Sequence, residues 1–341
     1  TIPFNLAVMV NPELEYQKCK ILSGEYKDEV WVVAKQLAGV FINGVANEEY
    51  KVIDEFLGEK LEGIKYEHPF HKDYEVYKEI KSKKLHSVLL STEYVDTSAG
   101  TGLVHCAPGC GPEDYEVGYR NELPPFNNID EKGTFPEEMK IFEGLVAKKD
   151  DHKFVEALKE RKALIAKTRV EHEYAHCWRH KSPVIFRTTK QWFFKIEDLK
   201  EKILAKNEDI KWVPKSASTQ FDAWISNLRD NSITKQRYWG TPAPIWVNEN
   251  DETDYIVIGN RKELQELGCE VPDDLHKPFI DEVIIKKDNK IYRRIPDVLD
   301  VWLDSGTVSW NCLYNDSELM KKWLPVDHVL EAKEQIRLWF Y

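Results

Sequence analysis

The chain lacks several features that would place it in particular classes of protein. No run of about 18 uncharged apolar residues occurs, which excludes a membrane-spanning helix. The first residues hold no basic stretch followed by an apolar core, so no signal peptide is predicted. The six cysteines are scattered over 341 residues, unlike the dense framework of a small secreted scaffold. We therefore expect a reduced, cytoplasmic location.

Positive charge is also scarce. The chain has 48 Lys and Arg against 59 Asp and Glu, which gives a net charge of −11. This acidic balance argues against a general nucleic-acid coat protein, although it leaves room for a local basic groove. Neither a Ser-centred nucleophile elbow nor a phosphate-binding P-loop occurs, and no internal repeat is visible.

What is present is the composition of a globular protein, with 42% hydrophobic and 31% charged residues and a length that suggests about two domains. Apolar residues at 4–10, 88–90 and 102–105 predict buried strands. Helices are predicted over residues 30–38 and from Asp150 onward. Nine of the 11 tryptophans fall at or beyond Trp192, and this change in composition suggests a domain boundary near residues 166–182.

Residues 100–115 form the segment that is richest in glycine, directly around a predicted strand that ends at His105. Glycine lets a backbone approach a ligand closely, and Pro112 suits the first turn of a following helix. Asp114 would lie in that first turn, where a carboxylate can anchor an amine, while His105 can orient a hydroxyl or a water. The alternative is structural, because a first-turn acid stabilises a helix and a histidine after a strand is often simply hydrogen-bonded.

Cysteine and histidine residues raise the possibility of a metal site. His105, Cys106 and Cys110 do not have the spacing of a zinc knuckle. Cys177-x-x-His180 is a better half-site, but no partner pair lies at a matching distance. No metal ligands are therefore assigned, and a zinc-dependent hydrolase built on Cys177, His180 and nearby histidines stays an alternative.

Five sequence motifs follow one another along most of the chain. They are Gly58–Phe70 (G-x-x-L-x-G-x-x-Y-x-H-P-F), Gly100–Gly118 (G-T-G-L-V-H-C-A-P-G at its start), His176–Pro183, Arg229–Pro242 (ending R-Y-W-G-T-P) and Asp297–Gly306 (ending D-V-W-L-D-S-G). Together they resemble isoleucyl-tRNA synthetases, which are class I aminoacyl-tRNA synthetases. His105 followed by Ala107-Pro108-Gly109 favours the isoleucyl over the valyl and leucyl members. The sequence of residues 228–234 resembles archaeal more than bacterial members.

The resemblance implies a particular α/β architecture. We expect a β-barrel-like editing domain with helices at residues 1–168, a junction back to the catalytic core at 169–215, and part of a Rossmann-type parallel α/β catalytic domain at 216–341. The family's ATP-binding H-I-G-H and K-M-S-K-S motifs and its anticodon-binding region are not found. Both ends look cut, so we expect a fragment that edits without activating isoleucine. Its interrupted catalytic part should expose sheet edge and apolar surface and be partly mobile or aggregation-prone.

In this family the editing domain hydrolyses valine wrongly attached to isoleucine tRNA, and also valyl-adenylate. The catalytic residues that the resemblance implies are Asp114, which would hold the α-ammonium group, His105, which would reject isoleucine by steric fit, and Thr1, which would position adenosine and water. The implied substrate-binding residues are Asn5, Gly100, Thr101 and Gly102. Residues Thr1–Asn5 match only the last five positions of the family's T-T-P-W-T-L-P-x-N strand. No general base is assigned, since positioned water and oriented dipoles can serve.

The second half resembles parts of the family's synthetic site. The matching residues are Trp302, Glu331, Glu334, Gln335 and Trp339. The stretch Glu331–Gln335 departs from the family's E-G-x-D-Q, because alanine replaces glycine and glutamate replaces aspartate, which argues against nucleotide binding there. For both tryptophans a role as a core anchor is the alternative.

The resemblance to isoleucyl-tRNA synthetases also implies partners and cofactors. We expect no cofactor for editing, whereas the full-length parent would use ATP and Mg. Whether the chain binds zinc is left undecided by the sequence. The partners would be the 3′ end of isoleucine tRNA and the valine or isoleucine adenylate, with no membrane, and the protein would be a monomer. Besides the editing hydrolase and the zinc hydrolase, a third hypothesis is a module that binds the tRNA 3′ end or an aminoacyl-adenosine without turnover.

Overall fold

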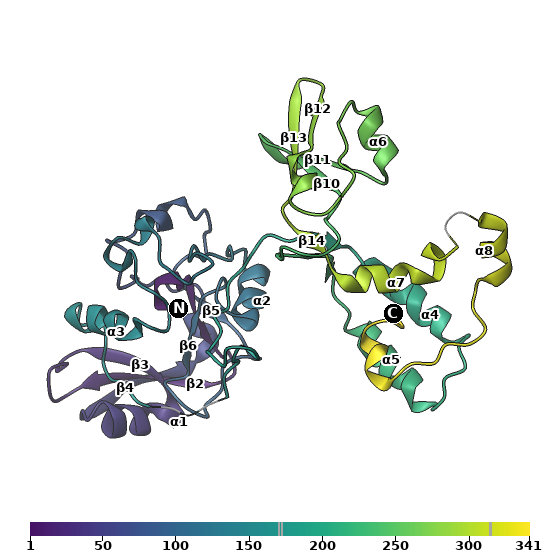
Figure 1. The fold of residues 1–341 in the computed structure, drawn as a ribbon. Coiled ribbons are helices and arrows are strands. Elements are labelled where there is room, and N and C mark those ends of the chain that lie inside the picture. Colours follow the sequence, from purple (N-terminus) through teal and green to yellow (C-terminus); the bar gives the residue numbers. More distant parts are fainter. Residues whose placement is uncertain (170, 172, 314–315) are drawn as a thin grey trace. The chain divides into compact units, whose positions relative to one another are not determined.

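The computed structural model describes residues 1–169, 171, 173–313 and 316–341. The chain divides into two compact units, Thr1–Thr189 and Lys190–Tyr341 (Figure 1). This division falls inside the predicted junction of residues 169–215, of which Val170 and His172 lie outside the described residues. No described helix is both long and apolar enough to cross a membrane.

The first unit contains two three-stranded sheets (Figure 1). In one sheet, β1 (Ala7–Val10) pairs in parallel with β5 (Ser87–Leu90) and antiparallel with β6 (Leu103–Cys106). In the other, β2 (Glu15–Ile21) lies between β3 (Val30–Ala34) and β4 (Tyr50–Leu57), and both pairings are antiparallel. Alternate residues of the first sheet face different cores, since Ala7 and Met9 join one core and Val10 joins the other.

The barrel-like form that we expected for residues 1–168 is not confirmed. In the described part of this unit, the strands make two open sheets and no closed barrel. A barrel needs a hydrogen-bonded ladder that returns to its first strand, whereas a single bond from Ala34 N to Thr101 O (2.9 Å) joins the end of β3 to the segment before β6. The sheets instead pack through side chains, with Val10 and Val88 in one core with Cys19.

Helices cover the first unit in short pieces. The predicted helix after the glycine-rich segment is confirmed as α2 (Pro112–Arg120), which begins at its proline, and Asp150 precedes α3 (Asp151–Glu160). The helix predicted over residues 30–38 is wrong in its first half. That half is strand β3, because Val30-Trp31-Val32-Val33 is rich in β-branched and aromatic side chains that fit a pleated sheet, and only α1 (Lys35–Ala38) is helical. The remaining short helical turns are η1 (Ile2–Phe4), η2 (Gly39–Val45), η3 (Gly58–Leu61), η4 (Glu75–Glu79) and η5 (Glu137–Phe142).

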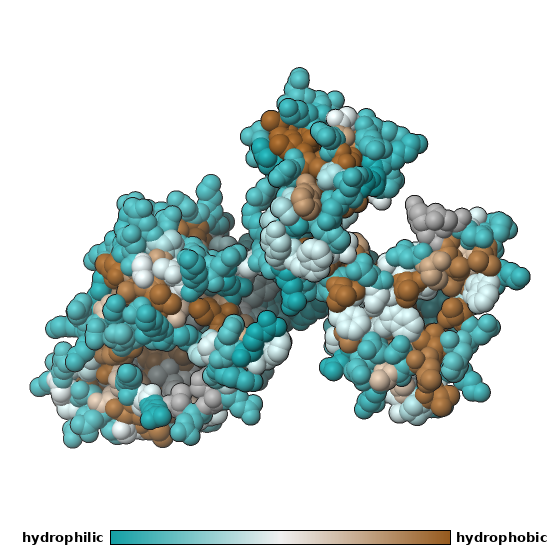
Figure 2. Space-filling view, in the orientation of Figure 1, coloured by the Kyte–Doolittle hydropathy of each residue, from teal (hydrophilic) through white to brown (hydrophobic). Residues whose placement is uncertain are grey.

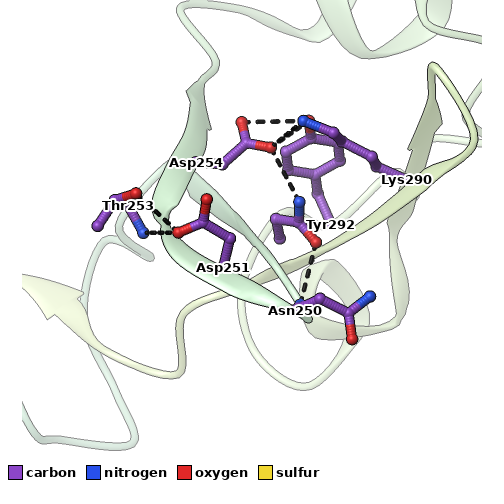
Figure 3. Close-up of polar contacts among 7 residues, drawn as sticks. Asn250, Asp251, Thr253, Asp254, Lys290 and Tyr292 are labelled. Atoms are coloured by element: carbon purple, nitrogen blue, oxygen red, sulfur yellow. Dashed lines mark hydrogen bonds and ion pairs between the residues drawn. The ribbon is translucent and has the colours of Figure 1, made fainter.

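The second unit contains a four-stranded sheet in the order β11-β10-β13-β12, formed by β10 (Ile245–Asn248), β11 (Asp251–Val257), β12 (Ile284–Lys287) and β13 (Lys290–Arg294). Trp246 and Tyr292 are buried in its core, beside α6 (Arg261–Glu266) and η7 (Phe279–Glu282). On this sheet Asp254 accepts hydrogen bonds from Lys290 (2.7 Å) and Tyr292 (3.1 Å), which ties neighbouring hairpins together (Figure 3).

The parallel sheet predicted for residues 216–341 is a second correction, since all strand pairs in the described part of this unit are antiparallel. The local sequence explains this. Asp288 and Asn289 both adopt positive φ, 51° and 60°, as a two-residue hairpin turn requires. Such a turn reverses the chain, so β12 and β13 must run in opposite directions. Two further pairs are short: β9 (Thr234–Lys235) with β14 (Val298–Leu299), and β7 (Phe193–Phe194) with β8 (Asn231–Ser232).

The helices of the second unit are α4 (Lys200–Asn207), α5 (Ser216–Ser226), α7 (Val301–Asn311), α8 (Ser317–Trp323) and the short turns η6 (Glu197–Leu199) and η8 (Lys333–Arg337). α5 packs on η8 through Phe221, Ile225 and Ile336. By contrast, α7 and α8 bury none of their described residues. Hydrophobic residues accordingly reach the surface over the helices of this unit (Figure 2).

Candidate functional site

Three segments that are far apart in the sequence meet where β1 begins and β6 ends. Asn5, in the turn between η1 and β1, donates from Nδ2 to the carbonyl oxygen of Ala7 at 2.8 Å. The same nitrogen lies 2.8 Å from Nδ1 of His105 in β6. Tyr66, from the Y-x-H-P-F motif, donates its hydroxyl to Oδ1 of Asn5. Asn5 therefore connects the N-terminal segment to both motifs.

The Y-x-H-P-F motif also holds the backbone of the N-terminal segment. His68 accepts from Phe70 N at its Nδ1 (3.1 Å), so its Nε2 carries the proton that it donates to Ile2 O (3.1 Å). Tyr77 donates to Pro3 O at 2.6 Å. No role was predicted for Tyr66 and His68 of this motif, nor for Tyr77, which follows it in the chain. Its polar residues among apolar ones were the available signal, but their partners lie more than 60 positions away.

Three histidines lie in this region: His68 is buried, and His86 and His105 are half-buried. Burial lowers the pKa of His68, His86 and His105 to about 4, from an ordinary 6.5. His68 and His86 stack with ring centroids 5.1 Å apart. The Nε2 atoms of His86 and His105 are buried without a hydrogen-bond partner among the described residues. Neutral imidazoles are the form that such an apolar setting favours.

Asp114 lies in the first turn of α2, as expected, and its Oδ2 accepts a hydrogen bond from Ala107 N at 2.9 Å. This bond places the carboxylate just beyond the end of β6, two residues after His105. Burial raises the pKa of Asp114, and the hydrogen bond from Ala107 acts in the opposite direction. Its Oδ1 has no donor within the described part of the chain, which leaves that oxygen for a ligand. No hydrogen bond joins Asp114 directly to His105 in the same residues.

A cavity of about 310 Å³ lies beside the N-terminal segment. Thr1 and Phe4 form part of its wall, together with Cys110 from the glycine-rich segment. Its lining is largely aromatic and aliphatic, and Lys148 and Asp151 supply charge. An apolar pocket of this size with a few polar groups is typical of small-ligand sites. Of the sequence-predicted residues, Thr1 reaches this cavity, while Asp114 and His105 are not among its described lining residues.

Gly100, Thr101 and Gly102 lie at the other end of β6 from Asp114. Cys106 follows Gly102 by four residue steps of extended strand, about 13 Å. Gly102 has a φ of +75°, and a Cβ on it would lie 2.4 Å from the Cβ of Ala34. Thr101 O accepts from Ala34 N. The structure thus brings Asn5 and His105 together, but it does not bring these three residues to Asp114.

The predicted synthetic-site residues lie in the second unit. Trp339 donates from Nε1 to Ser305 O at 2.8 Å, which joins the C-terminal segment to the D-S-G motif in α7. Gln335 accepts from Trp339 N at 3.4 Å. Trp302 is 43% exposed, so in this chain it is not a core anchor, and Glu331 and Glu334 are exposed as well.

Comparison with known proteins decides the family. A family model for class I tRNA synthetases of the isoleucine, leucine, methionine and valine group (I, L, M and V) matches residues 7–341. The chain belongs to the class I tRNA synthetases.

Among curated proteins, this class I tRNA synthetase chain is 38% identical to the isoleucine–tRNA ligases of Thermococcus kodakarensis and Pyrococcus furiosus, and 36% identical to that of Methanothermobacter marburgensis. Each alignment covers 100% of this chain and 32–34% of the relative. The resemblance to isoleucyl enzymes that the five motifs indicated is confirmed. The chain spans about a third of the length of these relatives.

A crystal structure of GlLeuRS-CP1 aligns with this synthetase chain at a TM-score of 0.35 and 17% sequence identity. The alignment covers 50% of this chain and 81% of that chain. At this TM-score the likeness carries no argument about the fold.

The residues of this synthetase chain do not fit a complete zinc site. In the described ranges, no group of three or more His, Cys, Asp or Glu residues is placed to hold a metal ion. Cys177 Sγ lies 3.5 Å from Nδ1 of His180, while His176 turns its Nδ1 to Tyr174 O at 2.8 Å. Two donors alone are half of a tetrahedral zinc site. The cofactor assignments made from the sequence stay predictions.

Proposed function

We propose that this class I tRNA synthetase chain carries the editing activity of an isoleucyl-tRNA synthetase. It would hydrolyse the ester between valine and isoleucine tRNA, and also valyl-adenylate, within the first unit. The observation that carries the proposal is the meeting of Asn5, Tyr66 and His105 through hydrogen bonds. These residues come from the three segments, 1–5, 58–70 and 100–118, whose sequences resemble the family's editing domain.

The chemical need for such an activity is clear. Valine is smaller than isoleucine by one methylene, which gives a hydrophobic pocket only about 1–3 kcal/mol of discrimination, a rule for which this enzyme family is the usual illustration. A second site that admits valine and excludes isoleucine removes the remaining error. The partners are therefore the aminoacylated 3′ end of isoleucine tRNA and the valyl-adenylate.

The geometry supports distinct roles for the residues. Asp114 Oδ2 is held by Ala107 N, so Oδ1 can accept a charge-assisted bond from the α-ammonium group of the substrate. His105, fixed by Asn5, supplies a rigid wall against the larger isoleucine side chain. Thr1 borders the cavity, where its hydroxyl can position adenosine or the attacking water.

A deacylation assay tests the proposal. The chain is incubated with isoleucine tRNA that has been mischarged with valine, and release of valine is compared with the rate without enzyme. Asp114→Asn keeps an acceptor for Ala107 N but removes the charge, so we expect it to reduce the rate about ten- to a hundredfold. Glu113→Gln is the matched control, since Glu113 is the exposed neighbouring acid in the same helical turn, and it should leave the rate unchanged.

Other outcomes have defined meanings. Wild-type deacylation at the no-enzyme rate would contradict the hydrolase. Binding of a non-hydrolysable valyl-adenosine amide without turnover would then favour the non-catalytic 3′-end module. His105→Ala should let isoleucyl-tRNA be hydrolysed as well, because it removes the ring that we propose to exclude the larger isoleucine side chain. The chain should not activate isoleucine by itself, since H-I-G-H and K-M-S-K-S are not in its sequence.

A further inference from the structure

We propose that Asn5 and Tyr66 are positioning residues that hold His105 as the neutral tautomer with its proton on Nε2. In the editing site His105 then acts as a hydrogen-bond donor and a shaped wall, and not as a base. The part of this inference that concerns the substrate rests on the proposed function, whereas the tautomer itself does not.

The orientation of the Asn5 amide follows from its neighbours. The carbonyl oxygen of Ala7 can only accept, so the amide group that lies 2.8 Å from it must be the NH₂. The opposite end, Oδ1, then faces the Tyr66 hydroxyl and accepts from it. A flipped amide would set its oxygen against the Ala7 carbonyl oxygen, and Ala7 and Tyr66 together thus fix one orientation.

The amide orientation in turn fixes the proton on His105. The second hydrogen of Asn5 Nδ2 points at His105 Nδ1, 2.8 Å away, and a donor there requires Nδ1 to be unprotonated. A neutral imidazole with a bare Nδ1 carries its proton on Nε2. The doubly protonated ring would set N–H against N–H₂, and the low pKa of about 4 that burial gives His105 agrees with a neutral ring.

The consequences for the chemistry are specific. A general base needs a bare nitrogen that faces the water, but the bare nitrogen of His105 is occupied by Asn5. Its Nε2–H is buried and has no partner among the described residues, so its remaining capacity is to donate. Both hydrogens of the Asn5 amide are used as well. Asn5 therefore acts through His105, in contrast to the direct substrate contact implied by the family resemblance.

Nitrogen NMR on the full chain tests the tautomer directly. The histidines are labelled with ¹⁵N, and the signal of His105 is identified by its loss in His105→Gln. Protonated and bare ring nitrogens have well-separated shifts. At pH 7 we expect the Nε2–H form in at least about tenfold excess over the Nδ1–H form. A dominant Nδ1–H form or a charged ring in the wild type would overturn the proposal without any variant.

Two variants sharpen the test. Asn5→Asp has nearly the same shape, but its ionised carboxylate only accepts hydrogen bonds, so His105 should move its proton to Nδ1 and the tautomer ratio should invert. Tyr66→Phe removes the bond to Oδ1 but leaves Ala7 in place, so the excess should fall only about threefold. Asn47→Asp, at an exposed position, is the matched control and should change nothing. An unchanged ratio in Asn5→Asp would overturn the positioning role.

Activity separates this inference from the proposed function. If the wild type deacylates valyl-tRNA, Asn5→Asp should lower the rate and Tyr66→Phe should lower it less, in the order of their tautomer ratios. Deacylation rates that do not follow the tautomer ratios of the wild type and the two variants would overturn the link between His105 and the reaction. If the wild type shows no deacylation but has the Nε2–H signature, the function fails while the positioning by Asn5 and Tyr66 stands.

Discussion

The two units differ in how completely they bury their own apolar residues. In the first unit Phe142 is 2% exposed and packs against Phe70 and Phe154, with ring centroids 5.0 Å and 4.4 Å away. In the second unit α7 carries Trp302 and Trp310, 43% and 48% exposed, and buries none of its described residues. The first unit thus has an aromatic core of its own around Phe142, whereas α7 places its tryptophans at the surface.

This difference separates two kinds of motif. The motifs at residues 58–70 and 100–118 meet each other and the N-terminal segment inside one unit, so their residues form a preorganised polar network. The motifs of the second unit leave residues such as Tyr238 and Trp239 at the surface, 65% and 68% exposed. The family model matches both units, but within the described residues only the motifs of the first unit are joined by a polar network of this kind.

Hydrogen exchange should show the largest contrast between the units. Amides in β2, which lies between two strands, are expected to exchange at least about a thousandfold more slowly than amides of α7, after correction for intrinsic rates. The physical reason is that a helix without buried side chains opens at little cost, whereas exchange in a core strand requires near-global unfolding. Peptide-resolved mass spectrometry provides the measurement. Equal protection in both segments would remove the distinction between the units.

A pair of aromatic truncations should give the next largest effect. Phe142→Ala removes a side chain from the centre of the aromatic core, and we expect it to destabilise the first unit by about 3–5 kcal/mol. Trp310→Ala, in α7, should change the unfolding free energy by no more than about 0.5 kcal/mol. Urea denaturation of both variants checks this. A loss of several kcal/mol in Trp310→Ala would mean that α7 is packed.

Acid should destabilise the first unit through three histidines whose pKa is lowered by burial. His68, His86 and His105 have a pKa of about 4 when folded, below the ordinary 6.5. Between pH 4 and pH 6.5 these histidines bind protons in the unfolded chain but stay unprotonated in the folded chain. His68 and His105 therefore each lower the unfolding free energy by up to about 1.4 kcal/mol per pH unit as the pH falls from 6.5 toward 4, and the more exposed His86 lowers it by less, since solvent screens its charge. The full stability is present above pH 6.5.

Urea denaturation at pH 7 and pH 5 measures this slope. His86→Gln removes one of the three imidazoles with a lowered pKa and should make the dependence of the unfolding free energy on pH shallower. His152→Gln, at an exposed position on α3, is the control and should retain the wild-type slope. The same slope in the wild type and in His86→Gln would rule out this linkage for His86.

The smallest effect is expected for an ion pair of the second unit. Lys235 lies 2.8 Å from Asp300, which also accepts from Trp302 N at the start of α7. Burial raises the pKa of Asp300, but the bonds from Lys235 and Trp302 outweigh it and the net pKa is lowered. Because Lys235 is 44% exposed, Lys235→Ala should cost at most about 1 kcal/mol. Lys202→Ala on exposed α4 is the control, and equal losses would show that the pair is worth nothing.

Part of the fold was predictable because its signals are local. Pro112 at the start of α2 and the short apolar runs of β5 and β6 are properties of neighbouring residues, and they were read correctly. The helix predicted over residues 30–38 was wrong in its first half because first-turn acids and a following glycine are helix signals, while the β-branched run between them forms a strand. The barrel and the parallel sheet came from the family resemblance, and the pairings of the described strands do not support them.

The sequence by itself determined the family, the order of the motifs and the identity of the candidate residues Asp114 and His105, because a motif is a pattern along the chain. Only the tertiary structure decided that Tyr66 and Asn5 meet His105, that Asp114 is anchored by Ala107, and that Gly100–Gly102 lie at the far end of the strand. The physical reason is that a hydrogen bond between residues 100 positions apart depends on how strands pair and twist, and no local pattern encodes that pairing.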